Sequence, residues 1–217
     1  MAKRLVRWFL AVTIVGLCLL VLSGRWADPW LWTYIAIWAA LGTYAMLMLD
    51  DDLARERFRP PSPGADRLSL RFIRLLAFAH LIVGALDSGR WHLAPVPIPL
   101  RIVSMAGMAV SFVVVFRAMR ANRFFSSVVR IQDDRGHHVV DSGPYARVRH
   151  PGYAGMIPSM PFSALALGSW VAFVMALVYV VLILRRVAFE DAFLQAHLNG
   201  YADYARRVRY KLLPGIW

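Results

Sequence analysis

The sequence predicts an all-α integral membrane protein, a bundle of five to six transmembrane helices. Three observations predict this fold class. The 217 residues are 59% hydrophobic with a mean hydropathy of +0.52, which exceeds the usual apolar share of a soluble domain. Apolar windows of about 20 residues recur, and this is the length of helix that crosses a bilayer core. The basic residues gather in alternate loops, as the positive-inside rule describes.

Six apolar windows are the candidate spans. The fifth is the shortest and contains Pro158 and Pro161, so we expect it to kink or to pair tightly with the sixth as a hairpin. Five spans with a re-entrant segment is the alternative. The first window begins like a signal peptide, but no small-residue cleavage site follows it, so we expect it to be retained. The windows lie near Leu5–Leu22, Trp30–Leu49, Leu70–Leu86, Pro99–Met119, Tyr153–Leu167 and Ser169–Leu184.

The net charge of +12 is explained by topology. Of the 25 basic residues, all but Arg25, Arg90 and Arg101 lie at the N-terminus, after the second and fourth windows, or in the C-terminal tail. This pattern predicts that both termini are cytoplasmic, and we expect a bacterial inner membrane. Membrane lipids are then the partners of the basic surface, and no nucleic-acid partner is expected.

The chain divides into two parts of different character. Residues 1–120 hold four spans and a cytoplasmic loop at 50–69, whose prolines and glycine predict a turn-rich linker. Residues 121–217 are richer in polar groups and combine a loop, a helical hairpin and a cytosolic tail. His80 lies inside the third window, and we interpret it as a neutral residue that forms hydrogen bonds between helices.

Several kinds of site are excluded by pattern. The sequence has no glycine-rich phosphate loop, no H-E-x-x-H motif, no Cys/His ligand set and no serine nucleophile elbow, and no metal site is expected. One stretch that remains is GPYARVRHPGYAG, residues 143–155. Its prolines fix the backbone, its glycines permit close approach to a ligand, and its tyrosines offer aromatic faces to a cation. It suits a flat, partly cationic cofactor, or it ties helices together as a structured loop.

The other stretch is RRVAFED, residues 185–191. If the sixth window continues as a helix, Arg186 and Glu190 are four residues apart and share a face. They form a solvated ion pair, or both point into a membrane-proximal cavity. In a cavity, Arg186 would present a planar donor fork to a carboxylate or phosphate. Glu190 would accept hydrogen bonds from a cationic or amino-bearing ligand.

Three stretches of the sequence, in this order, resemble a known family. HHVVDSGPYARVRHPGY, then RVAFED, then LNGYADYARRVRYKLLPGIW resemble the C-terminal core of the isoprenylcysteine carboxyl methyltransferase family, and the resemblance runs from Phe124 to Trp217. Integral-membrane phospholipid N-methyltransferases share the R-H-P-x-Y-x-G element. The resemblance implies a methyltransferase core in residues 121–217. It also implies a cytosolic-side cofactor pocket, built by the C-terminal helices and loops.

The resemblance implies S-adenosylmethionine as the methyl donor and S-adenosylhomocysteine as the product. It places the family's helix-end arginine at Arg186, which would contact the substrate, and makes Arg186 and Glu190 the catalytic residues. Two positions depart from the family. Members of the family usually have two adjacent glutamates where this chain has Glu190 and Asp191. Arg130 occupies a position where some members have a glutamine that binds the cofactor, and Gln132 is close enough in the sequence to replace that glutamine. The implied cofactor-binding residues are His137, His138, Val139, Val140, Tyr145, His150, Pro151, Gly152, Tyr153 and Glu190.

The nucleophile expected from this pattern is a carboxylate. A carboxylate is ionised at pH 7 and needs no base, whereas an amine or thiol must lose a proton, and no dedicated base is evident. We therefore expect O-methylation of a lipophilic small-molecule or prenylated substrate. Phospholipid N-methylation and small-thiol S-methylation are the alternatives, followed by an NADPH-dependent membrane reductase or a non-enzymatic scaffold. The sequence does not predict the oligomeric state.

Overall fold

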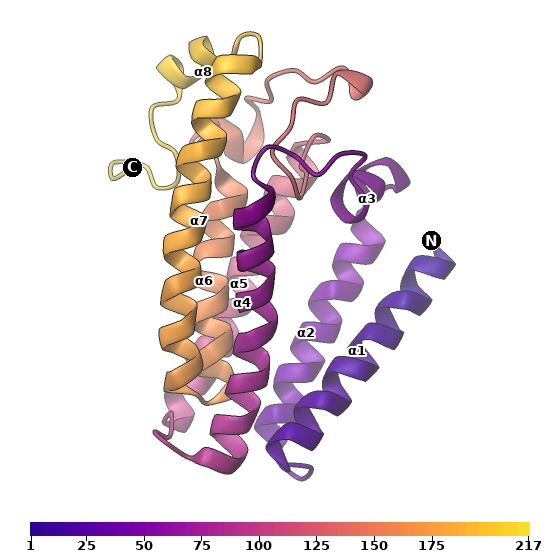
Figure 1. Cartoon of the computed structure of the whole chain (residues 1–217), viewed down its shortest axis with the longest axis vertical. Coiled ribbons are helices and arrows are strands. Elements are labelled where there is room, and N and C mark those ends of the chain that lie inside the picture. Colours follow the sequence, from indigo (N-terminus) through magenta and orange to yellow (C-terminus); the bar gives the residue numbers. More distant parts are fainter.

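The computed structural model describes residues 1–217 as an all-helical chain with no strands. Six long helices lie side by side and form the bundle, while most of the shorter elements gather at one end (Figure 1). The predicted fold class is confirmed. The long helices are α1 (Ala2–Ser23), α2 (Pro29–Met48), α4 (Arg67–Leu86), α5 (Ile98–Ala121), α6 (Pro151–Leu167) and α7 (Trp170–His197). The short elements are α3 (Asp51–Phe58), α8 (Tyr201–Arg207), a π-helical turn at Asp87–Trp91, and 3-10 turns at Asp133–Arg135 and Gly143–Ala146.

Five of the helices are long and apolar enough to cross a membrane: α1, α2, α4 with its π-helical turn, α5 and α7. The chain is therefore an integral membrane protein with five candidate spans. α6 has 17 residues and contains Pro158 and Pro161. It packs against both α5 and α7 and joins α7 through Gly168, whose φ of 94° suits the left-handed turn. The predicted hairpin is confirmed.

α7 extends beyond the predicted window. Its 28 residues correspond to about 42 Å of helix, more than the roughly 30 Å of a bilayer's hydrocarbon core. The last turns of α7 therefore extend beyond the hydrocarbon core. Arg186 and Glu190 lie where this extension begins, level with Tyr153 near the start of α6. The predicted continuation of this helix is confirmed.

The glycines of α6 serve helix packing. A Cβ at Gly155 would lie 2.5 Å from the Ser111 backbone oxygen of α5, and one at Gly152 would lie 2.5 Å from the Phe125 ring. The interpretation that Gly155 admits a ligand is wrong, because the backbone of α5 occupies that space. The two glycines let α6 lie close against α5 and the loop that follows it.

A polar contact inside the bundle connects three helices. His80 Nε2 lies 2.9 Å from Ser163 Oγ, and Ser163 Oγ lies 2.8 Å from the Tyr34 hydroxyl. His80 Nδ1 also lies 2.7 Å from the carbonyl oxygen of Ala77. His80 is thus a buried residue that forms hydrogen bonds between helices, as predicted, and these bonds join α4, α6 and α2.

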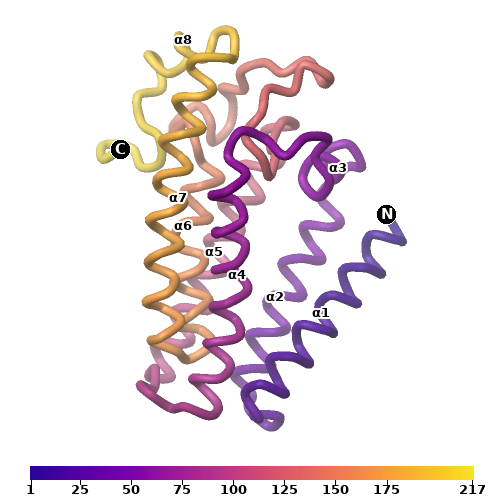
Figure 2. The backbone as a smooth tube through the Cα atoms, viewed as in Figure 1, coloured from indigo at the N-terminus to yellow at the C-terminus, as the bar shows by residue number.

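Both chain termini lie toward the end of the bundle that carries α3, α8 and the loop between α5 and α6 (Figures 1 and 2). We call this the pocket end. It also carries the basic loops after α2 and α5 and the basic tail. Arg25, Arg90 and Arg101 lie at the opposite end. The positive-inside pattern therefore predicts that the pocket end faces the cytoplasm. The division of the chain into an N-terminal part, residues 1–120, and a C-terminal part, residues 121–217, stays a prediction.

Candidate functional site

One cavity of about 370 Å³ lies at the pocket end. Its volume is within the usual range for small-molecule sites. Its walls come from α3, α4, α6, α7 and α8 and from the loop between α5 and α6. The predicted site residues that line it are His137, His138, Val139, Val140, Tyr145, His150, Gly152, Tyr153, Arg186 and Glu190. Residues from four separate stretches of sequence are thus brought to one space.

Pro151 is the predicted site residue that does not line the cavity. It is buried as the first residue of α6, a position where its fixed φ is already helical and its missing N–H costs no hydrogen bond. It begins the helix on which Gly152 and Tyr153 face the cavity. Its place indicates a structural part in the site.

The charged end of α7 meets α6 through a tyrosine. Arg186 Nε donates to the Tyr153 hydroxyl at 2.9 Å, and that hydroxyl donates to Glu190 Oε2 at 2.6 Å. Arg186 and Glu190 share a helix face and both line the cavity. This agrees with the possibility that both side chains point into a membrane-proximal cavity. They do not form the solvated ion pair that was the other possibility, because the hydroxyl of Tyr153 lies between them.

Arg186 has two further partners. Its Nη1 donates to Asp66 Oδ2 at 3.0 Å, and its Nη2 donates to the Ser127 backbone oxygen at 2.9 Å. The arginine is 4% exposed. It therefore joins α7 to α6, to the loop before α4 and to the loop after α5. Asp66 was not predicted as a site residue, because its partner lies 120 positions away.

The two adjacent histidines both lie against the ring of Phe124. The Phe124 ring is 4.6 Å from the His137 ring and 4.9 Å, edge-on, from the His138 ring. Burial lowers the pKa of His137 to about 4, with a smaller contribution from His138. His137 is therefore neutral at pH 7, and its Nδ1 accepts a hydrogen bond from the Gln132 N–H at 3.3 Å.

Residues 100–196 match the family model described as the isoprenylcysteine carboxyl methyltransferase (ICMT) family. These residues are less than half of the chain, and over them the sequence is similar to that family. The match confirms the predicted resemblance and agrees with a membrane methyltransferase. No curated protein matches the chain. The ICMT-like segment contains α5, α6, α7 and the loop with the two histidines, whereas α1 to α4 and the tail lie outside it.

The acidic pair of the ICMT-like segment has two different surroundings. Glu190 faces the cavity, whereas Asp191 is 1% exposed and binds Arg149 through two bonds, Nε to Oδ1 at 2.8 Å and Nη2 to Oδ2 at 2.9 Å. His150 Nε2 and the Tyr201 hydroxyl each lie 3.1 Å from the same Asp191 oxygen. Asp191 thus ties the start of α6 to the tail.

Arg149 is a structural residue that the sequence interpretation missed. Its Nη1 donates to the carbonyl oxygens of Val208 and Arg209, each at 2.8 Å. Arg147, two positions earlier, is exposed, as expected of a residue that only marks the basic side. The two arginines are two positions apart, a spacing that on extended backbone places both side chains on one side. Their spacing therefore did not predict that only Arg149 is buried.

Three tyrosines form an aromatic wall of the cavity: Tyr145, Tyr201 and Tyr204. The Tyr204 hydroxyl donates to the Tyr145 carbonyl oxygen at 2.7 Å, so α8 is held against the loop. Burial raises the pKa of all three hydroxyls well above the ordinary value. They remain neutral donors and apolar surfaces at physiological pH.

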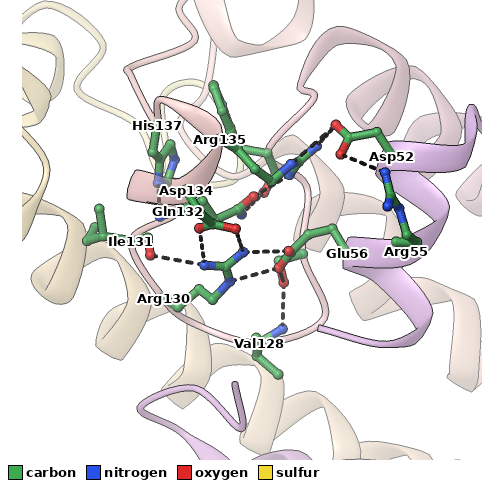
Figure 3. A network of polar contacts seen from close by, with 12 residues as sticks. Asp52, Arg55, Glu56, Val128, Arg130, Ile131, Gln132, Asp134, Arg135 and His137 are labelled. Carbon is green, nitrogen blue, oxygen red and sulfur yellow. Dashed lines mark hydrogen bonds and ion pairs between the residues drawn. The ribbon is translucent and has the colours of Figure 1, made fainter. Parts of the chain in front are cut away.

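The position that departs from the family, Arg130, is bound to α3. Its Nη2 donates to Glu56 Oε2 at 2.7 Å, its Nε to Glu56 Oε1 at 3.1 Å, and its Nη1 to Asp134 at 2.8 Å (Figure 3). These hydrogen bonds, which Arg130 donates to two carboxylates, raise the pKa of Arg130. Gln132 donates to the Phe124 carbonyl oxygen at 2.7 Å and accepts from Arg135. The nitrogen and the oxygen of its side-chain amide therefore both bind residues of the loop between α5 and α6, although Gln132 also lines the cavity.

A second ion pair fixes α3 to the same loop. Arg135 Nε donates to Asp52 Oδ2 at 3.2 Å (Figure 3). Asp52 and Glu56 are four residues apart on α3, so both carboxylates face the loop from one side of that helix. The ICMT-like segment is therefore clamped by a helix from outside it.

Proposed function

We propose that this chain is an S-adenosylmethionine-dependent methyltransferase that O-methylates a lipophilic carboxylate. The observation that carries the proposal is the cavity at the pocket end, in which the histidine and tyrosine walls, Glu190 and Arg186 meet. The ICMT match supports the reaction class. The methyl donor, the substrate and the cytoplasmic orientation of the pocket end are parts of the proposal.

The cavity fits a partly cationic cofactor. Its volume of about 370 Å³ is suitable for a small molecule, and Glu190 has no cationic side chain as partner in the chain. Glu190 would hold a positively charged part of the ligand, and Tyr145 and Tyr204 would offer it aromatic faces. When bound, S-adenosylmethionine supplies a methyl group on a positively charged sulfur.

Arg186 would hold the substrate carboxylate in position. Tyr153, Asp66 and Ser127 fix the guanidinium, and three of its five N–H groups are engaged, so two remain for a ligand. A guanidinium fixed before the substrate binds places the nucleophile without further loss of entropy. The carboxylate is already ionised at neutral pH, so the site needs no general base.

The remaining walls of the cavity are apolar and come from membrane helices. Leu70 and Ile73 of α4, Met156 of α6, and Ile183 of α7 line it. These side chains suit an alkyl or prenyl chain that enters from the bilayer, because burial of apolar surface is favourable at about 25 cal/mol per Å². An S-prenyl-cysteine with a free carboxylate combines the two chemistries that the cavity offers.

The cofactor part of the proposal is tested by titrating the purified protein with S-adenosylhomocysteine. We expect saturable binding, and we expect Glu190→Ala and Tyr153→Ala each to weaken it about tenfold or more. The first substitution removes the carboxylate that would hold the ligand's positive charge, and the second removes the hydroxyl that donates to that carboxylate. Asp203→Ala, an exposed carboxylate on α8, is the matched control and should bind normally. Absence of saturable binding, or equal binding by all variants, would contradict the cofactor assignment.

The substrate part is tested with Arg186→Ala and a labelled methyl donor. We expect this variant to retain S-adenosylhomocysteine binding and to lose turnover. The substrates offered are S-prenyl-cysteine, phosphatidylethanolamine and small thiols. Transfer to the amine or the thiol, but not to the carboxylate, would replace the carboxylate assignment with one of these nucleophiles. A large loss of cofactor affinity in Arg186→Ala would refute its role toward the substrate.

A further inference from the structure

Two arginines from distant parts of the chain converge beside the cavity. Arg57 Nη1 donates to the Ser126 carbonyl oxygen at 3.3 Å, and Arg186 Nη2 donates to the Ser127 carbonyl oxygen at 2.9 Å. Consecutive carbonyl groups thus receive the two guanidinium groups, and both arginines line the cavity. Arg57 comes from α3, outside the ICMT-like residues 100–196.

Arg57 has no carboxylate partner within the chain. Its neighbour Glu56 is bound to Arg130, and no ion pair includes Arg57, which uses one of its five donors and lies over the Phe125 ring at 5.4 Å. Burial and the nearby charge of Arg186 both lower its pKa. An arginine nonetheless remains charged at physiological pH, so this guanidinium needs an anion.

Three other arginines of the cavity wall are compensated by carboxylates. Arg130 binds Glu56, Arg149 binds Asp191, and Arg186 binds Asp66. Arg74 of α4 also lines the cavity and forms no ion pair, which adds to the surplus positive charge near Arg57. Glu190 accepts from the neutral Tyr153. The wall therefore has an acidic position for a cation and a separate basic position for an anion.

A buried hydroxyl marks the same place independently. Ser127 Oγ has no hydrogen-bond partner in the chain, although the residue is only 8% exposed and lines the cavity. An unpaired buried hydroxyl is unfavourable unless a ligand or solvent completes it. Its backbone oxygen is the acceptor for Arg186, so this hydroxyl lies within one residue of both guanidinium contacts.

We propose that Arg57 is a second carboxylate-binding residue, which together with Arg186 makes the site specific for an anionic lipophilic substrate. This inference rests on the proposed function. In that reaction a carboxylate oxygen attacks the methyl carbon, the new O–C bond forms as the S–C bond breaks, and the sulfonium becomes a neutral thioether. No proton moves, and the product is a neutral ester.

The loss of charge gives Arg57 a second effect. Charge-assisted hydrogen bonds from the two arginines are strong with the carboxylate and weak with the ester. The site therefore discriminates the substrate from its own product, which promotes product release. We expect the carboxylate to bind about ten- to a hundredfold more tightly than its methyl ester or carboxamide.

The test compares binding of S-prenyl-cysteine with binding of its carboxamide to the full chain in detergent. In Arg57→Gln we expect the carboxylate to lose about ten- to a hundredfold in affinity, while the carboxamide is unchanged. KM should rise with a smaller change in kcat, and Arg57→Lys should restore part of the preference. Arg55→Gln is the matched control, because Arg55 is on the same helix with a side chain 79% exposed.

Three results would overturn the inference: equal losses for the carboxylate and the carboxamide, no loss for either, or a larger dependence on Arg57 for phosphatidylethanolamine than for the carboxylate. The last result would assign the arginines to a phosphate. Titration of the same variants with S-adenosylhomocysteine separates this test from the proposed function. If the wild type binds no S-adenosylhomocysteine, the methyl-donor proposal fails, while the preference for carboxylate over carboxamide still tests Arg57.

Discussion

The two ends of the bundle use the same charged residue types in different ways. At the opposite end, Asp28 accepts a hydrogen bond from the Trp30 N–H at 3.0 Å and pairs with Arg25 and, at 3.7 Å, with Arg101. Arg90 donates to two carbonyl oxygens of α1. At the pocket end, Arg57, Arg74 and Glu190 line a cavity without an ion-pair partner. Charges at the opposite end are bound by the chain itself, whereas several charges of the pocket end are left open, and Arg186 combines a partner, Asp66, with N–H groups that stay free.

The pocket end itself contains both kinds of charge. Asp191 is bound by Arg149, His150 and Tyr201, whereas its neighbour Glu190 meets one tyrosine. Successive residues on a helix point about 100° apart, so one faces the tail and the other the cavity. The comparison therefore predicts that substitutions in closed networks lower stability and that substitutions at open charges lower ligand affinity.

The largest stability effect is expected at Asp191. Asp191→Ala leaves Arg149 as a buried cation without its carboxylate, and breaking a buried pair in this way costs about 3–5 kcal/mol. Thermal unfolding in detergent should show a marked decrease in Tm. Asp203→Ala, whose partner Arg206 is exposed, should leave Tm nearly unchanged. An Asp191→Ala protein with normal Tm that no longer binds S-adenosylhomocysteine would place Asp191 among the open charges.

The clamp between α3 and the loop should give a smaller, local effect. Glu56→Gln removes the carboxylate that Arg130 binds through two nitrogens, although Arg130 keeps Asp134. Loss of hydrogen bonds to a charged group costs about 2 kcal/mol. Hydrogen exchange should increase in residues 51–58 and 123–137, and carboxylate affinity should fall because Arg57 lies on α3. Unchanged exchange in both segments would show that the clamp does not hold α3 in place.

At the opposite end, Asp28→Ala should affect stability alone. It removes the N-cap of α2, which is typically worth about 1 kcal/mol, and leaves Arg101 without its acidic neighbour. We expect a decrease of roughly 1–2 kcal/mol in the free energy of unfolding, measured by denaturant titration. S-adenosylhomocysteine affinity should be unchanged. A change in S-adenosylhomocysteine affinity of tenfold or more would contradict the claim that charges at the opposite end contribute to stability alone.

The parts that the sequence predicted are those that local patterns encode. Apolar windows predicted the long helices, and the spacing of Arg186 and Glu190 predicted a shared face. Spacing on one helix does not specify what lies between two side chains, so the bridging hydroxyl of Tyr153 was not predicted. The contact of Arg186 with Asp66 was missed for a related reason. It joins residues 120 positions apart, and helix packing alone brings such residues together.

Arg57 shows the same limit more strongly. In the sequence it is one of several arginines in a loop next to acidic residues, which is the pattern of a solvated, self-paired surface. Its neighbours Asp52 and Glu56 pair instead with Arg135 and Arg130 of the ICMT-like segment. The pairing of those two carboxylates across the fold leaves Arg57 without an acid. An arginine without a carboxylate partner can be recognised only when the ion-pair partner of every nearby charged residue is known from the structure.

The smallest expected effect concerns His137, a polar residue of the cavity wall that burial keeps neutral. Its pKa is lowered from 6.5 to about 4, so below pH 6.5 the unfolded chain takes up a proton that the folded chain does not. Stability should therefore fall as pH decreases from 6.5 toward 4, with no contribution from His137 above that range. Tm measured between pH 4 and 7.5 should decrease less steeply in His137→Gln than in the wild type. Equal slopes in His137→Gln and the wild type would mean that His137 is solvated in the folded state.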